Sequence, residues 1–151
     1  MIPRLVRFAR LAAWERRVLV EALVLLPLTA LRIRRLGMMR ALEPGPAPAP
    51  AAPRNGDETQ RARRIARLVD WVARHGPYRA SCLPMSLTLQ RLLRARGIEA
   101  RLRLGVRMSG ERLEAHAWIE RDGEALMEAA HIGERFAAFA EPVVPRMGEL
   151  R

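Results

Sequence analysis

The chain has 151 residues, enough for one domain that buries a hydrophobic core without disulfides or metals. Its net charge is +11 and every basic residue is arginine, which predicts an acidic partner such as an acidic peptide, nucleic acid or anionic lipid. Aromatic residues make up only 5%, with no zinc-finger spacing or RNP-type sequence, so we expect no nucleic-acid partner. The single cysteine excludes an intrachain disulfide and indicates a reducing, cytoplasmic location.

Residues 1–41 contain an apolar run, residues 18–31, bracketed by arginines. The run is about two-thirds of the roughly 20 residues that span a bilayer, and it contains Glu21 and Pro27. It also starts late and no cleavage site follows, which argues against a signal peptide. We expect one or two helices, broken near Pro27, that pack on the main domain or on a partner. The alternative is an arginine-rich amphipathic helix that contacts a membrane surface.

Residues 42–58 read LEPGPAPAPAAPRNGDE, in which alternating prolines favour extended polyproline II. This stretch is the one clear boundary in the chain. We therefore predict an N-terminal helical extension over residues 1–41, a linker over residues 42–58 and the main domain over residues 59–151.

Two helices follow. Thr59–His75 has apolar residues at helical spacing and ends before Gly76-Pro77. Cys82–Arg96 begins after the expected N-cap Ser81 and is closed by Gly97. The stripe predicted to be buried in the second helix consists of Met85, Leu89, Leu92 and Leu93.

Strands occupy the next part of the chain. Alternating apolar residues predict a half-buried antiparallel strand over Ile98–Val106, a polar loop over Met108–Arg112, and a third strand over Glu124–Ala129. The second strand lies between them, with Ala115, Ala117 and Ile119 on one face and His116, Trp118 and Glu120 on the other. The C-terminal stretch is expected to cover the sheet edge through Phe136, Phe139, Val143 and Val144.

Cys82 and His116 are the candidate chemical pair. A helix N-terminus favours a thiolate, because its free N–H groups and the helix dipole stabilise negative charge. A histidine beside a thiolate can act as general acid and base in nucleophilic catalysis. His75 and His131 are expected to be a helix-end and a loop residue. A zinc site from Cys82, His116 and His131 lacks paired ligand spacing, so we predict neither metal nor cofactor.

The turn between the last two strands decides which acid orients His116. If Asp122-Gly123 forms a two-residue type I′ turn, His116 faces Ala129 and Glu128 points to the other side of the sheet. If Gly123 forms a G1 bulge in a three-residue loop, His116 lies opposite Glu128, with Cβ atoms about 5 Å apart. We adopt the three-residue loop because it gives the histidine a carboxylate. A Cys–His dyad is the alternative to this Cys82–His116–Glu128 triad.

Two further residues share the face of His116. Trp118 is expected in the core or on a groove wall, with substrate contact as the alternative. Glu120 is expected as a rim charge or a second orienting acid. Both are candidate substrate-binding residues.

The chain resembles a known family in the order of its motifs: C-L-x-x-S-L, a leucine-rich helix ending in R-x-R-G-I-x-A, R-L-x-x-G-V, A-H-A-W-I-E, and D-G. These look like the transglutaminase-like cysteine peptidases of lasso-peptide biosynthesis, which remove the leader from a ribosomally made precursor. The resemblance covers residues 60 to 130 and extends loosely to the N-terminal helices. It implies an α+β fold with a transglutaminase/papain-like core, in which a cysteine-bearing helix packs on a small antiparallel sheet.

The resemblance also implies roles. Cys82 would be the nucleophile and His116 its acid and base, while Glu128 falls where the family usually has aspartate. Met85 stands where the family often has arginine. Implied partners are the precursor peptide, a small leader-binding protein and a downstream ATP-dependent macrocyclase. The alternatives are acyl transfer by the same Cys–His pair, as in a transglutaminase, and a peptide-binding scaffold without catalysis.

Overall fold

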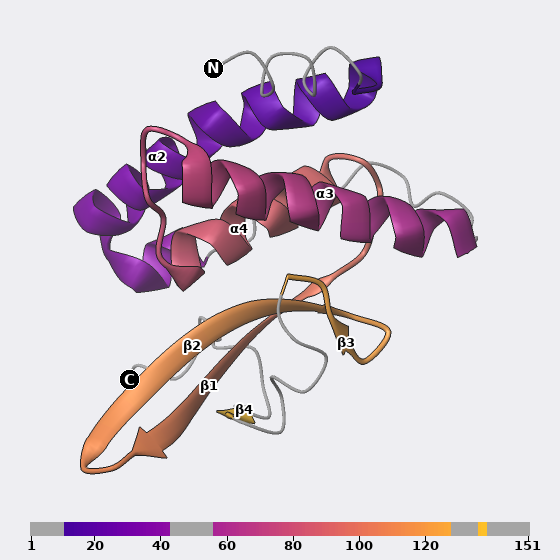
Figure 1. Ribbon diagram of the computed structural model, residues 1–151. Helices are drawn as coiled ribbons and strands as arrows, with labels where there is room; N and C mark the ends of the chain where they lie inside the picture. The colour runs from indigo at the N-terminus through magenta and orange to yellow at the C-terminus, as the bar shows by residue number, and fades with distance from the viewer. Residues whose placement is uncertain (1–10, 43–55, 128–135, 139–151) are drawn as a thin grey trace, which may run out of the picture.

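The computed structural model describes residues 11–42, 56–127 and 136–138, which form a helical layer on an antiparallel sheet (Figure 1). The helices are α2 (Ala13–Ala41), α3 (Gly56–His75) and α4 (Cys82–Arg94). The strands are β1 (Arg101–Ser109), β2 (Arg112–Arg121), β3 (Glu124–Ala125) and β4 (Ala137–Ala138), in the order β3-β2-β1-β4. α2 packs on α3 and α4, and α4 packs on β2 and β1. The fold is therefore the expected α+β arrangement, with the cysteine-bearing helix on the sheet.

α2 continues through Pro27, so the break predicted there is wrong. Pro27 is exposed, and so is Leu23, whose carbonyl loses its usual N–H donor and can be hydrated instead. The backbone leaves helical geometry at Gly37, where φ is 81° and ψ is 163°, a conformation that glycine adopts readily. No helix among the residues described here is long and apolar enough to cross a membrane.

One hydrophobic core joins all three helices to the sheet. One side of α2 is buried in it, which confirms that the N-terminal helix packs on the main domain. Core members include Val18, Leu19, Ala22 and Leu26 of α2, Ile65, Val69 and Val72 of α3, Leu89, Leu92 and Leu93 of α4, and Ile98, Ile119 and Leu126. Met85 is only partly buried against this core. The division of the chain at the linker remains a prediction, since residues 43–55 lie outside the described part.

Both ends of α4 lie where they were expected. Ser81 is the N-cap in an extended conformation, but its side chain makes no capping hydrogen bond, and only its carbonyl takes part, by accepting the Met85 N–H at 3.2 Å. At the other end Gly97 has φ 71°, the Ile98 N–H donates to the Leu93 carbonyl at 3.0 Å, and the Gly97 N–H donates to the Arg94 carbonyl at 3.1 Å. This is a Schellman motif, with buried Leu93 and Ile98 as its apolar contact.

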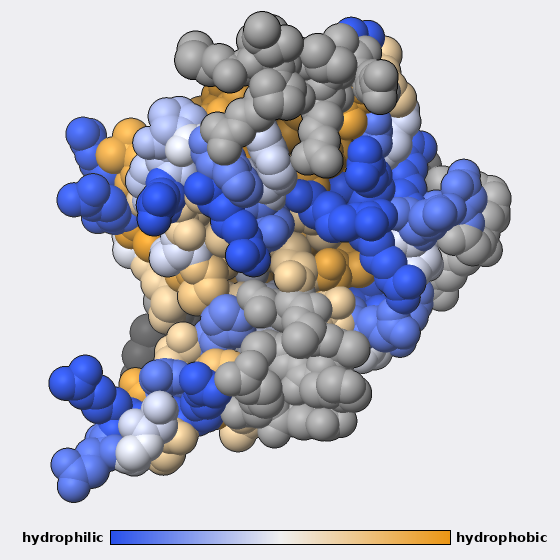
Figure 2. Space-filling view, viewed as in Figure 1, coloured by the Kyte–Doolittle hydropathy of each residue, from blue (hydrophilic) through white to orange (hydrophobic). Residues whose placement is uncertain are grey.

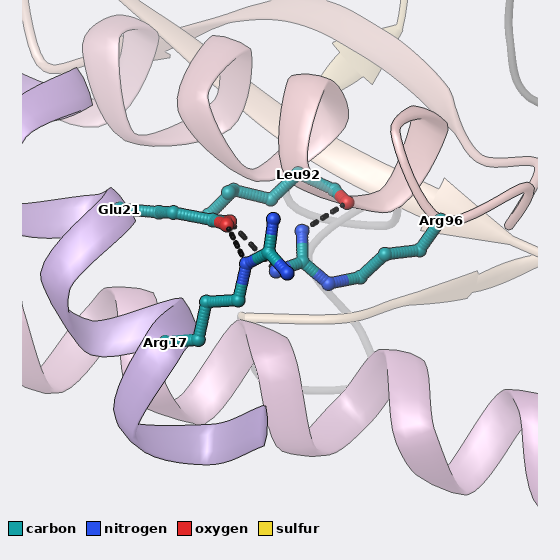
Figure 3. A network of polar contacts seen from close by, with 4 residues as sticks. All are labelled: Arg17, Glu21, Leu92 and Arg96. Atoms are coloured by element: carbon teal, nitrogen blue, oxygen red, sulfur yellow. Dashed lines mark hydrogen bonds and ion pairs between the residues drawn. The ribbon is translucent and has the colours of Figure 1, made fainter. Parts of the chain in front are cut away.

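Two charged contacts join α2 to the other helices. Glu21 accepts from Arg17 at 2.9 Å and from Arg96 at 2.6 Å, and Arg96 also donates to the Leu92 carbonyl (Figure 3). Burial would raise the pKa of Glu21, but these hydrogen bonds outweigh it and hold that pKa below its usual value. The pKa of Glu15 is also lowered, chiefly by its hydrogen bond from Arg64 at 2.5 Å.

β1 and β2 form a long hairpin that begins and ends later than the sequence suggested. β1 covers Arg101–Ser109 instead of Ile98–Val106, because Ile98 is used as the buried contact at the end of α4. Ser109 pairs with Arg112, so the expected five-residue loop is a two-residue turn at Gly110-Glu111. In the middle of the hairpin Gly105 lies opposite His116.

The turn from β2 to β3 is the two-residue alternative, so the three-residue loop adopted above is wrong. Arg121 pairs with Glu124, and both turn residues have positive φ, 51° at Asp122 and 82° at Gly123, as a type I′ turn requires. β3 ends at Ala125, after which the Leu126 N–H still donates to the Ile119 carbonyl at 2.9 Å. This register removes the geometric reason for setting Glu128 opposite His116, although Glu128 itself lies outside the described residues, as do residues 129 and 131.

Candidate functional site

Cys82 is the first residue of α4 and carries a free, half-buried thiol. It lies on the same helical stripe as Ser86, Leu89 and Leu93, at spacings that keep one face of a helix in register. Those three are fully buried, so the stripe runs from the core to a partly accessible sulfur at the helix start. A half-buried position suits a nucleophile, since it is both held by packing and open to substrate.

His116 lies in the middle of β2 and is half-buried between aromatic rings. Its ring stacks on Phe136 with centroids 5.1 Å apart and an interplanar angle of 28°, and on Trp118 at 6.2 Å and 18°. Gly105 makes room for this stack, since a Cβ there would lie 2.9 Å from the Trp118 ring and 3.0 Å from the Cβ of Phe136. The His116 imidazole is therefore held by close packing against Phe136 and Trp118, next to Gly105 of β1.

A hydrogen bond links the helix of Cys82 to the strand of His116. The Ser86 hydroxyl, one turn after Cys82, donates to the carbonyl of Ala117 at 2.9 Å, and both residues are buried. Because Ala117 directly follows His116, the first turns of α4 lie beside this part of β2. Apart from the spacing of Ser86 from Cys82, nothing in the sequence indicates this bond.

The bond also shows how α4 meets the sheet. The Ile119 carbonyl points to the β3 side of β2, where it accepts from Leu126. Carbonyls two residues apart in a strand point the same way, so the Ala117 carbonyl lies on that edge too. β3 ends before reaching it, and Ser86 takes the position of a further strand partner. The start of α4 therefore lies along the β2 edge.

The two faces of β2 are as the alternation predicted. Ile119 belongs to the core under the helices, whereas Trp118 and Phe136 form a second buried cluster on the opposite face, with His116 stacked against it. The Ser86–Ala117 bond therefore brings the start of α4 to the edge of β2 next to His116, while the His116 ring lies on the face of β2 opposite the helices. β4 pairs with β1 at Gly105 and Val106, so residues 136–138 cover a sheet edge as expected, whereas residues 139, 143 and 144 lie outside the described part of the chain.

One charged pair borders this cluster. The Arg107 guanidinium lies 4.7 Å from the centre of the Phe136 ring and is paired with Glu114 at 2.6 Å. A cation over the ring face is attracted to it and helps to hold Phe136 in place. The sequence reading did not assign a role to Arg107, Glu114 or Gly105.

The two candidate substrate-binding residues lie in different settings. Trp118 is 1% exposed, which agrees with the core assignment. Glu120 is half-buried beside Arg103 at 3.6 Å and helps line a small cavity of about 180 Å³. The cavity is lined by residues 99–101 and 120–123, at the far end of the strand from His116, so it is not a groove that reaches the Cys–His pair. Substrate contact by Trp118 and Glu120 remains a proposal.

Comparison with known proteins agrees with this architecture. Residues 22–141 match the transglutaminase-like superfamily, and the chain belongs to that family. A curated relative is the microcin J25-processing protein McjB of Escherichia coli, 31% identical over 64 residues. The matched part is 42% of this chain and 30% of that relative, so the chain spans well under half of it. No solved structure matches the chain.

Proposed function

We propose that the protein is a cysteine peptidase that removes the leader from a ribosomally made lasso-peptide precursor. The observation that carries the proposal is the Ser86–Ala117 hydrogen bond, which anchors the turn after Cys82 to the strand residue after His116. The membership of the transglutaminase-like superfamily and the similarity to a microcin-processing protein support a peptide substrate. The motif resemblance narrows that substrate to a lasso-peptide precursor.

The chemistry would run in two steps. The Cys82 thiolate attacks the carbonyl carbon of the last leader residue, and His116 gives a proton to the leaving amine as the C–N bond breaks. This frees the core peptide and leaves the leader as a thioester on the sulfur. Water then attacks the thioester while His116 takes its proton, which releases the leader carboxylate and restores the thiolate.

The start of α4 offers the oxyanion site. The first backbone N–H groups of a helix have no intrahelical acceptor, and those of Cys82 and Leu83 belong to this set. Pro84 has no N–H, so these two amides are the donors nearest the sulfur. They would stabilise the negative oxygen formed in each step.

The third catalytic member and the partners are parts of the same proposal. Glu128 enters only through the family pattern, because the turn observed at Asp122-Gly123 does not favour its pairing with His116. A Cys82–His116 dyad is the simpler arrangement. The leader-binding protein and the ATP-dependent macrocyclase are the partners that the family resemblance implies.

The test is leader release measured by mass spectrometry. The purified protein is incubated with a candidate lasso-peptide precursor, with and without a small leader-binding protein. We expect Cys82→Ala and His116→Asn to abolish release, and His75→Asn, at the exposed end of α3, to retain it. Release that survives Cys82→Ala would overturn the proposal. Amide products formed with added amines, in place of free leader, would instead assign the pair to acyl transfer.

Iodoacetamide labelling separates catalysis from a scaffold role. A thiolate nucleophile reacts faster at pH 6 than a free cysteine does. Reaction at the rate of a free cysteine, together with no leader release, would favour a peptide-binding scaffold.

A further inference from the structure

α2 has two apolar sides, and only one of them packs against the rest of the protein. Val18, Ala22 and Leu26 are buried in the core. A second stripe on the outside of the helix is about half exposed: Val20 55%, Val24 53%, Leu28 54% and Leu31 48%. An exposed row of large aliphatic side chains on one helix marks an interaction surface more often than chance.

Arginines lie at both ends of this outer stripe. Arg16 and Arg17 precede it, and Arg32, Arg34 and Arg35 follow it, all of them exposed. Arg32, Arg34 and Arg35 form no ion pair with any residue that the structure describes. Of the two acids of α2, Glu15 is buried against Arg64, and Glu21 pairs with Arg96 and with Arg17, which leaves Arg16 and the three later arginines as the flanking cations that neither acid pairs with. The outside of α2 is thus apolar in the middle and cationic at its ends.

A second copy of this chain fits the stripe poorly. If two α2 helices packed in parallel, each arginine group would meet its own copy. If they packed antiparallel, Arg16 and Arg17 would approach the partner's later arginine group. Either arrangement brings like charges together, which costs free energy and disfavours self-association.

The features of the stripe favour lipid over a folded protein partner. Its described members are Val and Leu, residue types that rarely dominate protein-protein binding, and no aromatic side chain anchors its centre. α2 is the outermost helix of the layer in Figure 1, and Figure 2 shows hydrophobic and hydrophilic residues next to one another on the helical layer. The outer stripe of α2, with its aliphatic side chains and flanking arginines, suits a lipid surface, because binding to lipid needs no directional contacts.

We propose that the outer face of α2 docks the protein on an anionic bilayer surface. The helix would lie in the plane of the interface, with Val20, Val24 and Leu28 in the acyl boundary and the arginines at the phosphate groups. This inference does not depend on the peptidase activity. It concerns the location at which any activity of the chain takes place.

The test is flotation of the full-length protein with vesicles. Phosphatidylcholine vesicles are compared with vesicles that also contain phosphatidylglycerol. We expect flotation only with the anionic vesicles, and weaker flotation as salt screens the arginines. Val24→Ser with Leu28→Ser should lower the bound fraction about tenfold, since it removes apolar insertion. Replacement of Arg32, Arg34 and Arg35 by glutamine should do the same by removing charge.

Matched controls use residues elsewhere in the chain that are also exposed. Met108→Ser with Leu113→Ser removes two exposed apolar side chains from the β1–β2 hairpin and should leave flotation unchanged. Glutamine at Arg91, Arg101 and Arg112 removes three exposed charges away from α2 and should lower flotation less than the α2 variant.

Three outcomes would overturn the proposal. They are no flotation with anionic vesicles, equal flotation with neutral ones, and equal loss in the controls and the α2 variants. Failure to float combined with slower leader release by the Val24/Leu28 variant in lipid-free solution would assign the stripe to a protein partner. Circular dichroism melts of each variant establish that it is folded.

Discussion

The hydroxyl of Ser86 donates to the main-chain carbonyl of Ala117 at 2.9 Å, in a place where neither residue is open to solvent. The two residues stand next to the candidate nucleophile and the candidate base: Ser86 is one helical turn from Cys82, and Ala117 follows His116. A single side chain thus fixes how the helix start meets the strand edge. Its loss should affect chemistry as well as stability.

Replacement of Ser86 by alanine tests this relationship. The Ala117 carbonyl would lose its partner in the core, at a cost of about 1–3 kcal/mol in unfolding free energy. We also expect slower leader release at saturating precursor, because the start of α4 would no longer be held against the β2 edge. Urea unfolding and kinetics of release give the two readouts.

Thr88→Val is the matched control. Thr88 is equally buried on the same helix, but its hydroxyl donates to Thr29 of α2 at 3.2 Å, away from the sheet. This variant should lose stability and keep its rate of release. Equal rate losses in both variants would mean that Ser86 acts only through general stability.

Gly105→Ala should disturb the aromatic stack on His116. The added Cβ would come within 3.0 Å of Trp118 and Phe136, both tightly packed, so these rings must shift. Overpacking of this kind costs about 1–3 kcal/mol in unfolding free energy. It should also change the ring-current shift of the His116 imidazole protons in an NMR spectrum.

His75 serves as the internal reference in that spectrum. It stacks on Trp71 at the end of α3, and its resonances should not move in the Gly105 variant. Phe136→Leu should change the His116 resonances as well, because it removes the nearest ring. His116 resonances unchanged in both variants would show that the rings do not confine the imidazole.

Acid should destabilise the contacts of α2 with its neighbours. The folded-state pKa values of Glu15 and Glu21 lie below 4.5, so each carboxylate stabilises the fold fully at neutral pH. That contribution is lost as the pH falls from about 4.5 through the lower folded-state values. Glu21→Gln should therefore be less stable than the parent at pH 7 and approach it in stability in strong acid.

Denaturant unfolding at a series of pH values measures this effect. Glu111→Gln, in the exposed β1–β2 turn, is the control and should leave the pH profile unchanged. A stability gap between parent and Glu21→Gln that stays constant from pH 7 to strong acid would contradict the assignment.

Periodic apolar residues allowed much of the helical layer to be predicted. α3 and α4 were found to within a few residues because Leu89, Leu92 and Val72 repeat at helical spacing and are bounded by Ser81, Gly76 and Gly97. A glycine at the end of a helical pattern commonly adopts the left-handed conformation that ends the helix, so the position of the end can be predicted. The two faces of β2 were also predicted correctly, because successive side chains of a strand point to opposite faces and strict alternation assigns each one to a face.

The β2–β3 turn could not be chosen from sequence, because Asp122-Gly123 suits both loop lengths. The observed two-residue turn is accompanied by contacts distant in sequence, since Ser86 occupies the strand edge beyond β3 and Arg121 is buried at the base of the turn. Pro27 was misread as a helix break, because its effect depends on whether the carbonyl it leaves without a donor faces solvent. Catalytic geometry is harder still, as the position of residue 128 depends on that turn.

The buried pair of Arg121 and Glu58 gives the last prediction. Arg121 is 5% and Glu58 9% exposed at the side chain, they are 3.2 Å apart, and Arg121 also donates to the Glu99 carbonyl at 2.9 Å. Removal of Glu58 leaves buried Arg121 with the exposed Asp122 carboxylate at 3.4 Å as its remaining ionic partner among the described residues, so Glu58→Ala should cost about 3 kcal/mol in unfolding free energy. The double variant Glu58→Met, Arg121→Met removes both charges and should be more stable than either single variant, because apolar side chains can replace a buried pair at little cost. Urea unfolding of the parent, Glu58→Met, Arg121→Met and the double variant completes a double-mutant cycle, and additive losses would show that the pair is not coupled.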